Sequence, residues 1–213
     1  MTEEKEIKFA ILKGTNFDLA KAKECYTFVS NEEQLDRTAR ANGLYIIYAD
    51  GHAEPYTGAN IKDNVRYIGV VFEGKSFAVS LKESEEVVLL SKDDPAGERK
   101  RLNRECDAIH DFDSFKNTAA LCEDNPKLRE VLEKGEAIPA LGVLNIIAHL
   151  REALNEALEY VGGAALSDTW YWSSTEYNPG NAWVVYFSNG GAYTYLNYYF
   201  KSYGNAVRAV AAF

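Results

Sequence analysis

The sequence predicts an α+β fold, in which strands and helices occupy separate stretches of the chain. Two β-rich runs over residues 66–81 flank Glu73-Gly74-Lys75 and indicate a β-hairpin. Apolar residues at three- and four-residue spacing over residues 144–161 indicate an amphipathic helix. From Trp170 onward, aromatic and β-branched residues between Gly- and Asn-rich turn signals predict a sheet.

The first part of the chain is predicted to be a short α/β segment. Residues 7–12 alternate partly and indicate a strand. The capping-box pattern Ser30-Asn31-Glu32-Glu33 starts a helix, which Asn42-Gly43 ends. Residues 44–48 form the next predicted strand. We therefore assign residues 1–50 to an N-terminal segment and residues 51–213 to a larger domain.

The middle of the chain contains one more predicted strand, at residues 87–90, and then a polar stretch over residues 91–118 that we expect to be irregular. Asp111-Phe112-Asp113 in this stretch suggests calcium. However, Lys116 stands where an EF-hand loop needs Gly and Cys122 where it needs Glu, so turn chemistry is the better interpretation.

Two helices are predicted to follow this stretch. Pro126 starts the first, which Gly135 ends, and Gly162-Gly163 ends the second. The strand Trp183–Phe187 is predicted in the sheet, and residues 207–211 are predicted to close it.

Charge and hydropathy exclude several protein classes. The net charge of −9 argues against a nucleic-acid binder, which normally needs a basic face. Acidic residues flank the basic run at Arg99–Arg101 and Arg104, which favours a solvated helix face over a phosphate site. The N-terminus lacks the basic start and apolar run of a signal peptide, and no stretch reaches the roughly 18 apolar residues of a membrane span. We expect cytoplasmic synthesis without Sec export and no membrane insertion.

The cysteines Cys25, Cys106 and Cys122 are widely spaced and odd in number. This arrangement favours reduced thiols over a disulfide framework, although a single bridge remains open.

No enzyme motif is present in the sequence. It has no Gly-x-Ser-x-Gly, His-Glu-x-x-His, Cys-x-x-Cys or phosphate-binding Gly-rich loop, and His52, His110 and His149 lie in unrelated contexts. No catalytic residue, metal or cofactor is therefore predicted. A carboxylate pair that only the fold brings together, as in a carbohydrate-active enzyme, remains an alternative.

The final forty-odd residues are rich in tyrosine and asparagine. Tyrosine gives a large contact area with few torsions to freeze, and Asn adds adaptable hydrogen bonds, as in antibody loops. Tyr193, Tyr195 and Asn197 share strand parity and should lie on one face. The candidate ligand-binding residues are Tyr177, Asn178, Asn181, Tyr186, Asn189, Tyr193, Tyr195, Asn197, Tyr198, Tyr203 and Asn205.

Two charged residues of the same region are better explained by structure than by chemistry. Arg208 lies between Val207 and Val210, which favours a scaffold salt bridge or donation to loop carbonyls over anion binding. Glu176 is expected to order the adjacent Ser-Ser-Thr turn.

Four blocks in this region resemble a C-type-lectin-like family that is widespread in gut bacteria and their phages. They are Tyr171–Glu176, Ala182-Trp183, Phe187–Gly190 and Val207–Val210. The resemblance covers roughly residues 65–213 and departs at Val143, where the family usually has Glu, and at Ser114, where Gly is common.

The resemblance implies a C-type-lectin-like fold with a short N-terminal α/β extension and a display region at about residues 170–213. The family includes the variable proteins of diversity-generating retroelements, which present diversified side chains to ligands or receptors. The resemblance also implies that one set of residues is not varied and forms the structural frame of the display region: Trp172, Ser173, Ser174, Glu176, Trp183, Phe187, Arg208 and Val210. Related formylglycine-generating oxidases need paired C-terminal cysteines, and none follows Cys122.

We therefore expect a non-enzymatic binding protein, used in receptor binding or adhesion at a virion or cell surface. Its expected partner is a protein or glycan ligand on a cell surface. Two alternatives remain: an assembly module whose aromatic sheet joins subunits into a homo-oligomer, and a carbohydrate-active enzyme on the same fold.

Overall fold

The structure is a computed structural model, and it describes residues 40–90, 101–188 and 194–213. The chain divides into Met1–Arg40, which lies almost wholly outside the described residues, and the compact unit Ala41–Phe213. The strand predicted at residues 7–12 and the helix predicted from Ser30 therefore lie outside the described residues. The division at residue 50 stays a prediction, although the compact unit begins ten residues earlier, at Ala41.

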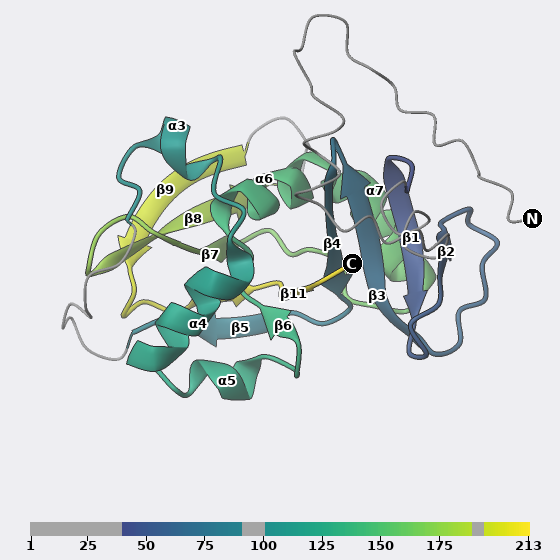
Figure 1. The fold of residues 1–213 in the computed structure, drawn as a ribbon, viewed down its shortest axis with the longest axis horizontal. Helices are drawn as coiled ribbons and strands as arrows, with labels where there is room; N and C mark the ends of the chain where they lie inside the picture. The colour runs from purple at the N-terminus through teal and green to yellow at the C-terminus, as the bar shows by residue number, and fades with distance from the viewer. Residues whose placement is uncertain (1–39, 91–100, 189–193) are drawn as a thin grey trace, which may run out of the picture. The chain divides into compact units, whose positions relative to one another are not determined.

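The compact unit is a mixed α+β fold with two β-sheets and a few short helices, as the sequence predicts (Figure 1). The first strands of the described residues are β1 Gly43–Tyr48, β2 Ala53–Pro55, β3 Val65–Phe72, β4 Lys75–Ser80, β5 Ser84–Val87 and β6 Glu136–Ala137. The last are β7 Trp170–Glu176, β8 Asn181–Phe187, β9 Thr194–Phe200, β10 Asn205–Val207 and β11 Val210–Ala211. The helices are α3 Glu105–Ala108, α4 Ser114–Asp124, α5 Leu128–Val131, α6 Leu141–His149 and α7 Arg151–Tyr160.

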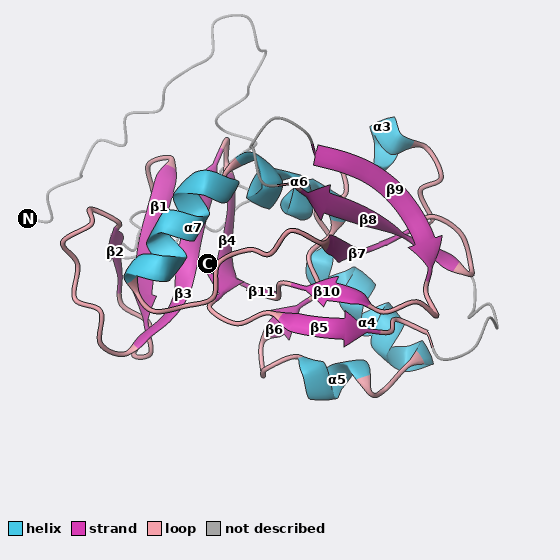
Figure 2. Cartoon of the chain, turned by 180° about the vertical axis from the view of Figure 1, so that it is seen from behind, coloured by secondary structure: helices cyan, strands magenta, loops and turns pink. Residues whose placement is uncertain are grey.

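In the described part of the chain, one sheet has the strand order β2-β1-β3-β4-β11-β6 and is called the large sheet below. The other has the order β5-β10-β7-β8-β9 and is called the small sheet. The predicted hairpin is confirmed as β3 and β4, and Glu73 and Gly74 take positive φ values of 45° and 75° at its turn. Helix α7 lies against the large sheet (Figure 2).

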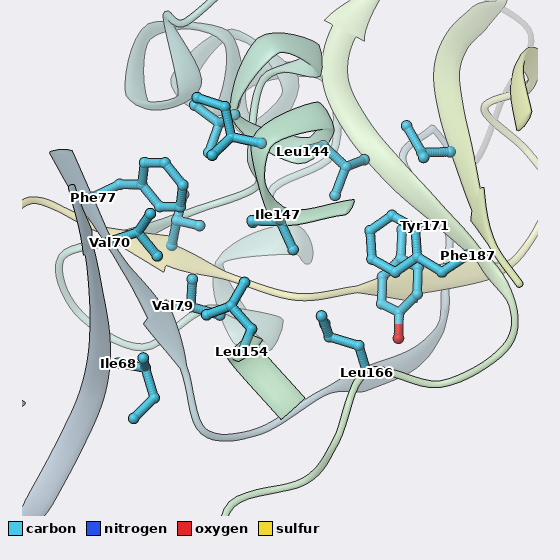
Figure 3. Packing of buried hydrophobic residues seen from close by; sticks show 14 of the residues in the cluster. Ile68, Val70, Phe77, Val79, Leu144, Ile147, Leu154, Leu166, Tyr171 and Phe187 are labelled. Atoms are coloured by element: carbon cyan, nitrogen blue, oxygen red, sulfur yellow. The ribbon is translucent and has the colours of Figure 1, made fainter. Parts of the chain in front are cut away.

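The main core lies between the two sheets and helices α6 and α7. The large sheet contributes alternate residues of β3 and β4, because successive strand residues point to opposite faces. Figure 3 shows Ile68, Val70, Phe77 and Val79 packing towards Leu144, Ile147 and Leu154 of the helices and towards Tyr171 and Phe187 of the small sheet.

A second core covers the opposite face of the small sheet. Trp172, Val184 and Val207 pack there against Leu121 of α4 and Leu128 of α5. The middle strands of the small sheet are therefore buried on both faces, and β5 and β9 are its two outer strands.

The helix predicted over residues 144–161 is two helices, α6 and α7, which meet at Leu150. Helix α6 is buried on several sides, whereas α7 buries one stripe, so the two segments have different surroundings. The apolar spacing is continuous across Leu150 and could not indicate the break. Positive-φ Gly162 ends α7 as predicted.

Other boundaries differ from the prediction. Residues 91–100 lie outside the described part, but α3 and α4 occupy much of the stretch predicted to be irregular. Helix α4 forms because Thr118 and Leu121 gain buried contacts that its polar composition conceals. The next helix is shorter than predicted, with bounds Leu128–Val131, and β5 ends at Val87, where the predicted strand begins.

The C-terminal strands lie where the sequence predicts them, but the prediction did not include their division between two sheets. The predicted strand Trp183–Phe187 lies within β8. Residues 207–211, predicted to close one sheet, instead pass from β10 in the small sheet to β11 in the large sheet. Arg208 lies between the two strands and is fully buried.

Candidate recognition surface

Strand β9 is an edge strand that carries exposed aromatic side chains. It pairs with β8 in a regular antiparallel register, for example Tyr186 with Tyr195 and Trp183 with Tyr198. In the described residues no strand lies on its other side. We define the β9 surface as the exposed residues Tyr195, Asn197, Tyr198, Phe200 and Tyr203.

The β9 surface holds most of the large exposed apolar and aromatic side chains of the described residues. Tyr195, Phe200 and Tyr203 are more than half exposed, at 56%, 51% and 54%. The others in the described part, Ile61 and Phe115, lie far away in sequence. Such clustering at a surface marks an interaction site more often than scattered apolar residues do.

One face of β9 continues a row of aromatic rings that begins inside the small sheet. The Trp170 ring lies 5.2 Å from the Tyr186 ring and 4.9 Å from the Tyr199 ring. The Tyr195 ring lies 6.4 Å from that of Tyr186, and the Tyr203 ring 6.4 Å from that of Tyr199. These separations are typical of aromatic packing, so the exposed rings are held by half-buried ones.

The other face of β9 has a smaller aromatic group. The rings of Tyr177 and Tyr198 stack with centroids 3.8 Å apart and an interplanar angle of 4°. Trp183 meets the edge of both rings. The Tyr198 hydroxyl beside it, together with burial, raises the pKa of Tyr177. Both faces of the strand therefore present tyrosine on a tryptophan support.

A buried ion pair fixes the end of β9. The Lys201 ammonium donates to the Glu176 carboxylate, and both side chains are almost fully buried. The backbone N–H of Lys201 also donates to Gly180, and its carbonyl accepts from Leu90. The turn that carries Tyr203 is thus anchored to β7 and to the segment after β5. Glu176, which was expected to order the adjacent Ser-Ser-Thr turn, pairs with Lys201.

Buried tryptophans support the sheet through their ring N–H groups. Trp172 Nε1 donates to the Val87 carbonyl, and Trp183 Nε1 donates to the Leu102 carbonyl, each at 2.7 Å. The residues that the family resemblance assigns to the frame are all buried: Trp172, Ser173, Ser174, Glu176, Trp183, Phe187, Arg208 and Val210.

Arg208 forms a buried salt bridge and donates to backbone carbonyls, as the sequence predicts. Its guanidinium donates to the carboxylate of Glu83 at 3.0 Å and to the carbonyls of Ser80 and Ala165. The same carboxylate accepts from the Tyr171 hydroxyl. Burial, and then this hydrogen bond, raise the pKa of Tyr171 well above its ordinary value.

Asp111 is a structural residue. Its carboxylate accepts from the Asn117 amide and the Thr175 hydroxyl, each at 2.8 Å, and its own carbonyl accepts from Gly142. Thr175 in turn accepts from the backbone of Leu141. This network ties α4, α6 and β7 together. In the described part of the chain, no three His, Cys, Asp or Glu side chains gather as metal ligands.

The predicted ligand-binding residues fall into distinct groups. Tyr195, Asn197, Tyr198 and Tyr203 lie on the β9 surface, and Tyr177, Asn181 and Tyr186 are half-buried beside it. Asn178 accepts from the backbone N–H groups of Gly180 and Asn181, which makes it part of the β7–β8 turn. Asn205 is only 9% exposed and lies in β10, so the structure places it in the interior. Asn189 and Tyr193 lie outside the described residues.

Phe200 is the exposed residue that the sequence prediction missed. It shares strand parity with Tyr198, so alternation along β9 could have identified it. The prediction counted Tyr and Asn and left out phenylalanine. Tyr195 and Asn197 share a face, as their parity predicts, but the opposite face of β9 is exposed as well.

A separate open cleft of about 740 Å³ lies beside the end of β1, far from β9 in the sequence. Its lining includes Tyr48, His52 and Glu54. The Tyr48 hydroxyl donates to Glu54 at 2.6 Å, which raises the pKa of Tyr48 to about 12 and lowers that of Glu54. The Glu54 carboxylate also accepts from the Asn60 amide, so Tyr48 and Glu54 are already engaged in hydrogen bonds within the protein. Among the described helices, none has the length and hydropathy needed to cross a bilayer.

The chain is similar in structure to a fimbrial protein from Bacteroides ovatus ATCC 8483, with a TM-score of 0.60 and 15% sequence identity. The match covers 82% of this chain and 49% of that chain, so this chain spans about half the length of the protein it matches. No protein-family model and no curated protein matches the sequence. At this identity the likeness shows a shared fold, and the C-type-lectin-like family stays a prediction.

Proposed function

We propose that this chain is a non-enzymatic recognition module that binds a protein or glycan ligand through the β9 surface. The observation that carries the proposal is the gathering of exposed aromatic rings on one strand and the turn after it. Tyrosine and phenylalanine rings provide apolar area for a ligand, and the tyrosine hydroxyls and Asn197 provide hydrogen bonds around it.

The supports beneath the β9 surface favour binding by a preformed site. Tyr186 contacts the exposed Tyr195 ring and Trp183 contacts the exposed Tyr198 ring. Trp170 packs against Tyr186, and the Lys201–Glu176 pair fixes the turn. A preorganised surface loses less conformational entropy on binding than a loose loop does. The fold therefore offers a rigid platform for recognition.

The likeness to a fimbrial protein agrees with a surface-associated role, adhesive or structural. We extend the proposal to a cell or virion surface as the place of action. A C-type-lectin-like scaffold whose β9 codons are diversified by a retroelement is the most specific form of the proposal. The neighbouring DNA tests this form, because it requires a reverse-transcriptase gene and a near-copy of the 3′ end.

The binding proposal is tested with the full chain on an array of immobilised glycans and a panel of extracellular proteins. Tyr195→Ser and Tyr203→Ser remove rings that are more than half exposed. Each should weaken binding to any array member by about tenfold or more, because aromatic anchors carry much of an interface's binding energy.

Phe115→Ser is the matched control, because Phe115 is an exposed aromatic residue on α4, with 47% exposure. It should leave binding unchanged. Equal losses from Phe115→Ser and Tyr195→Ser would contradict the assignment of the β9 surface, and so would binding that survives both tyrosine changes.

A further inference from the structure

The free side of β9 presents backbone hydrogen-bonding groups from alternate residues. The N–H of Lys201 points towards the β8 side, where it donates to Gly180. The N–H of Tyr198 instead donates to the Asn197 side chain at 2.8 Å. In an antiparallel strand these directions alternate. The backbone groups of Leu196, Tyr198 and Phe200 therefore point away from β8.

Strand β9 lacks the features that usually protect an edge. It contains no charged residue and no proline, and its pairing with β8 shows no register shift. In the described residues, two polar contacts occupy its free side: the Asn197 amide oxygen accepts from the Tyr198 N–H, and the Phe200 carbonyl accepts from the Tyr203 N–H at the end of the strand. A long, neutral edge strand of this kind is a template for another strand.

The sequence of β9, Thr-Tyr-Leu-Asn-Tyr-Tyr-Phe, is complementary to itself in antiparallel orientation. With a twofold axis at Asn197, Tyr195 lies opposite Tyr199 of the second copy, and Leu196 lies opposite Tyr198 of the second copy. Leu196 and Tyr198 both direct backbone groups outward, so the hydrogen bonds match. Aromatic and apolar cross-strand pairs of this kind stabilise a sheet. This register also pairs the whole length of the strand.

We propose that β9 pairs with β9 of a second copy of this chain, antiparallel about Asn197, to form one continuous sheet across both molecules. The Asn197 side chain then releases the Tyr198 N–H, which bonds to the second copy. The pairing uses the edge of the strand and leaves both of its faces open. It joins the two β9 surfaces into one larger surface and does not depend on the recognition function.

The pairing should be weak and sensitive to salt. A single strand pair forms a small interface of the transient class. Each copy also carries a net charge of −9, so added salt should strengthen association by screening repulsion. Sedimentation velocity over a concentration series should show a monomer–dimer equilibrium that shifts towards dimer as salt rises.

Cysteine cross-linking tests the register directly. Residues opposite each other in a non-hydrogen-bonded antiparallel pair have Cα atoms about 4.5 Å apart, within disulfide range. Asn197→Cys, in a Cys25→Ser/Cys106→Ser background, should form a disulfide-linked dimer in oxidised glutathione. Tyr203→Cys in the same background is the control: it is exposed but lies beyond the strand, and it should cross-link much more slowly.

Asn197→Asp gives a second test that keeps an acceptor for the Tyr198 N–H. It sets two carboxylates face to face at the axis and should weaken the dimer by about fivefold, with recovery in high salt. Tyr203→Asp adds the same charge away from the axis and should have a smaller effect. A chain that stays monomeric up to about 1 mM would overturn the proposal. So would a dimer that ignores Asn197→Asp, or equal cross-linking at residues 197 and 203.

Discussion

At the level of single residues, hydrogen-bond partners distinguish the buried frame residues from the exposed residues of the β9 surface. Trp172 and Trp183 are aromatic residues of the same C-terminal region as the β9 tyrosines. Their ring N–H groups, however, donate to backbone carbonyls inside the fold. Asn178 and Asn197 are likewise both asparagines in the tail, but one forms a turn and the other is exposed on β9. The Tyr- and Asn-rich composition predicted where the recognition surface lies in the sequence. The hydrogen-bond partners and the exposure of each side chain then show which residues form the frame and which form the surface.

The Lys201–Glu176 pair is the residue-scale feature on which the end of β9 depends. Lys201→Met removes the ammonium that pairs with the buried Glu176 carboxylate, and it should lower the free energy of unfolding by about 3–5 kcal/mol. Urea unfolding measures the change. The double variant Lys201→Met/Glu176→Gln should recover most of the loss, because it removes the buried charge. A single change that costs less than about 1 kcal/mol would show that the pair does not support the strand.

At the element scale, the sequence predicted elements that carry their own pattern. The β3–β4 hairpin and β8 have alternation and turn residues, and both were found where expected. The split at Leu150 and the change of sheet between β10 and β11 have no local pattern, because they arise from contacts with distant strands. The exposed edge of β9 is also a property of strand order, which alternation alone does not give.

The Tyr171–Glu83–Arg208 network that joins the sheets predicts a pH dependence. The pKa of Tyr171 is raised above its ordinary value of 10.0, so above pH 10 the folded state holds a proton that the unfolded state releases. This contribution to stability is complete below pH 10 and is lost as pH rises through the folded pKa. Wild-type stability should therefore fall in this alkaline range.

Tyr171→Phe should make that alkaline fall shallower, while it costs about 1–3 kcal/mol at neutral pH through loss of the hydrogen bond to Glu83. Urea unfolding midpoints over a pH series measure both effects. Tyr203→Phe, at an exposed tyrosine, serves as the control and should preserve the wild-type alkaline slope. An unchanged slope in Tyr171→Phe would contradict the assignment to this network.

At the scale of the whole molecule, the two sheets have different roles. The large sheet and helices α6 and α7 provide most of the main core, whereas the small sheet extends from that core to an open edge. The fold is similar to that of a fimbrial protein over most of this chain. The exposed tyrosines of β9 lie at the open edge of the small sheet. A stable base and an uncovered aromatic strand suit a molecule that binds at a surface.

We expect the β9 surface to be open in the free chain and covered when the chain binds its ligand. Hydroxyl-radical footprinting of the full chain, read by mass spectrometry, tests both halves. Tyr195, Tyr198, Phe200 and Tyr203 should be oxidised in the free chain and protected on the target found with the array, while Phe115 and Ile61 stay equally oxidised in both states. Slow oxidation of β9 in the free chain, or protection at Phe115 or Ile61 in place of β9, would contradict the claim.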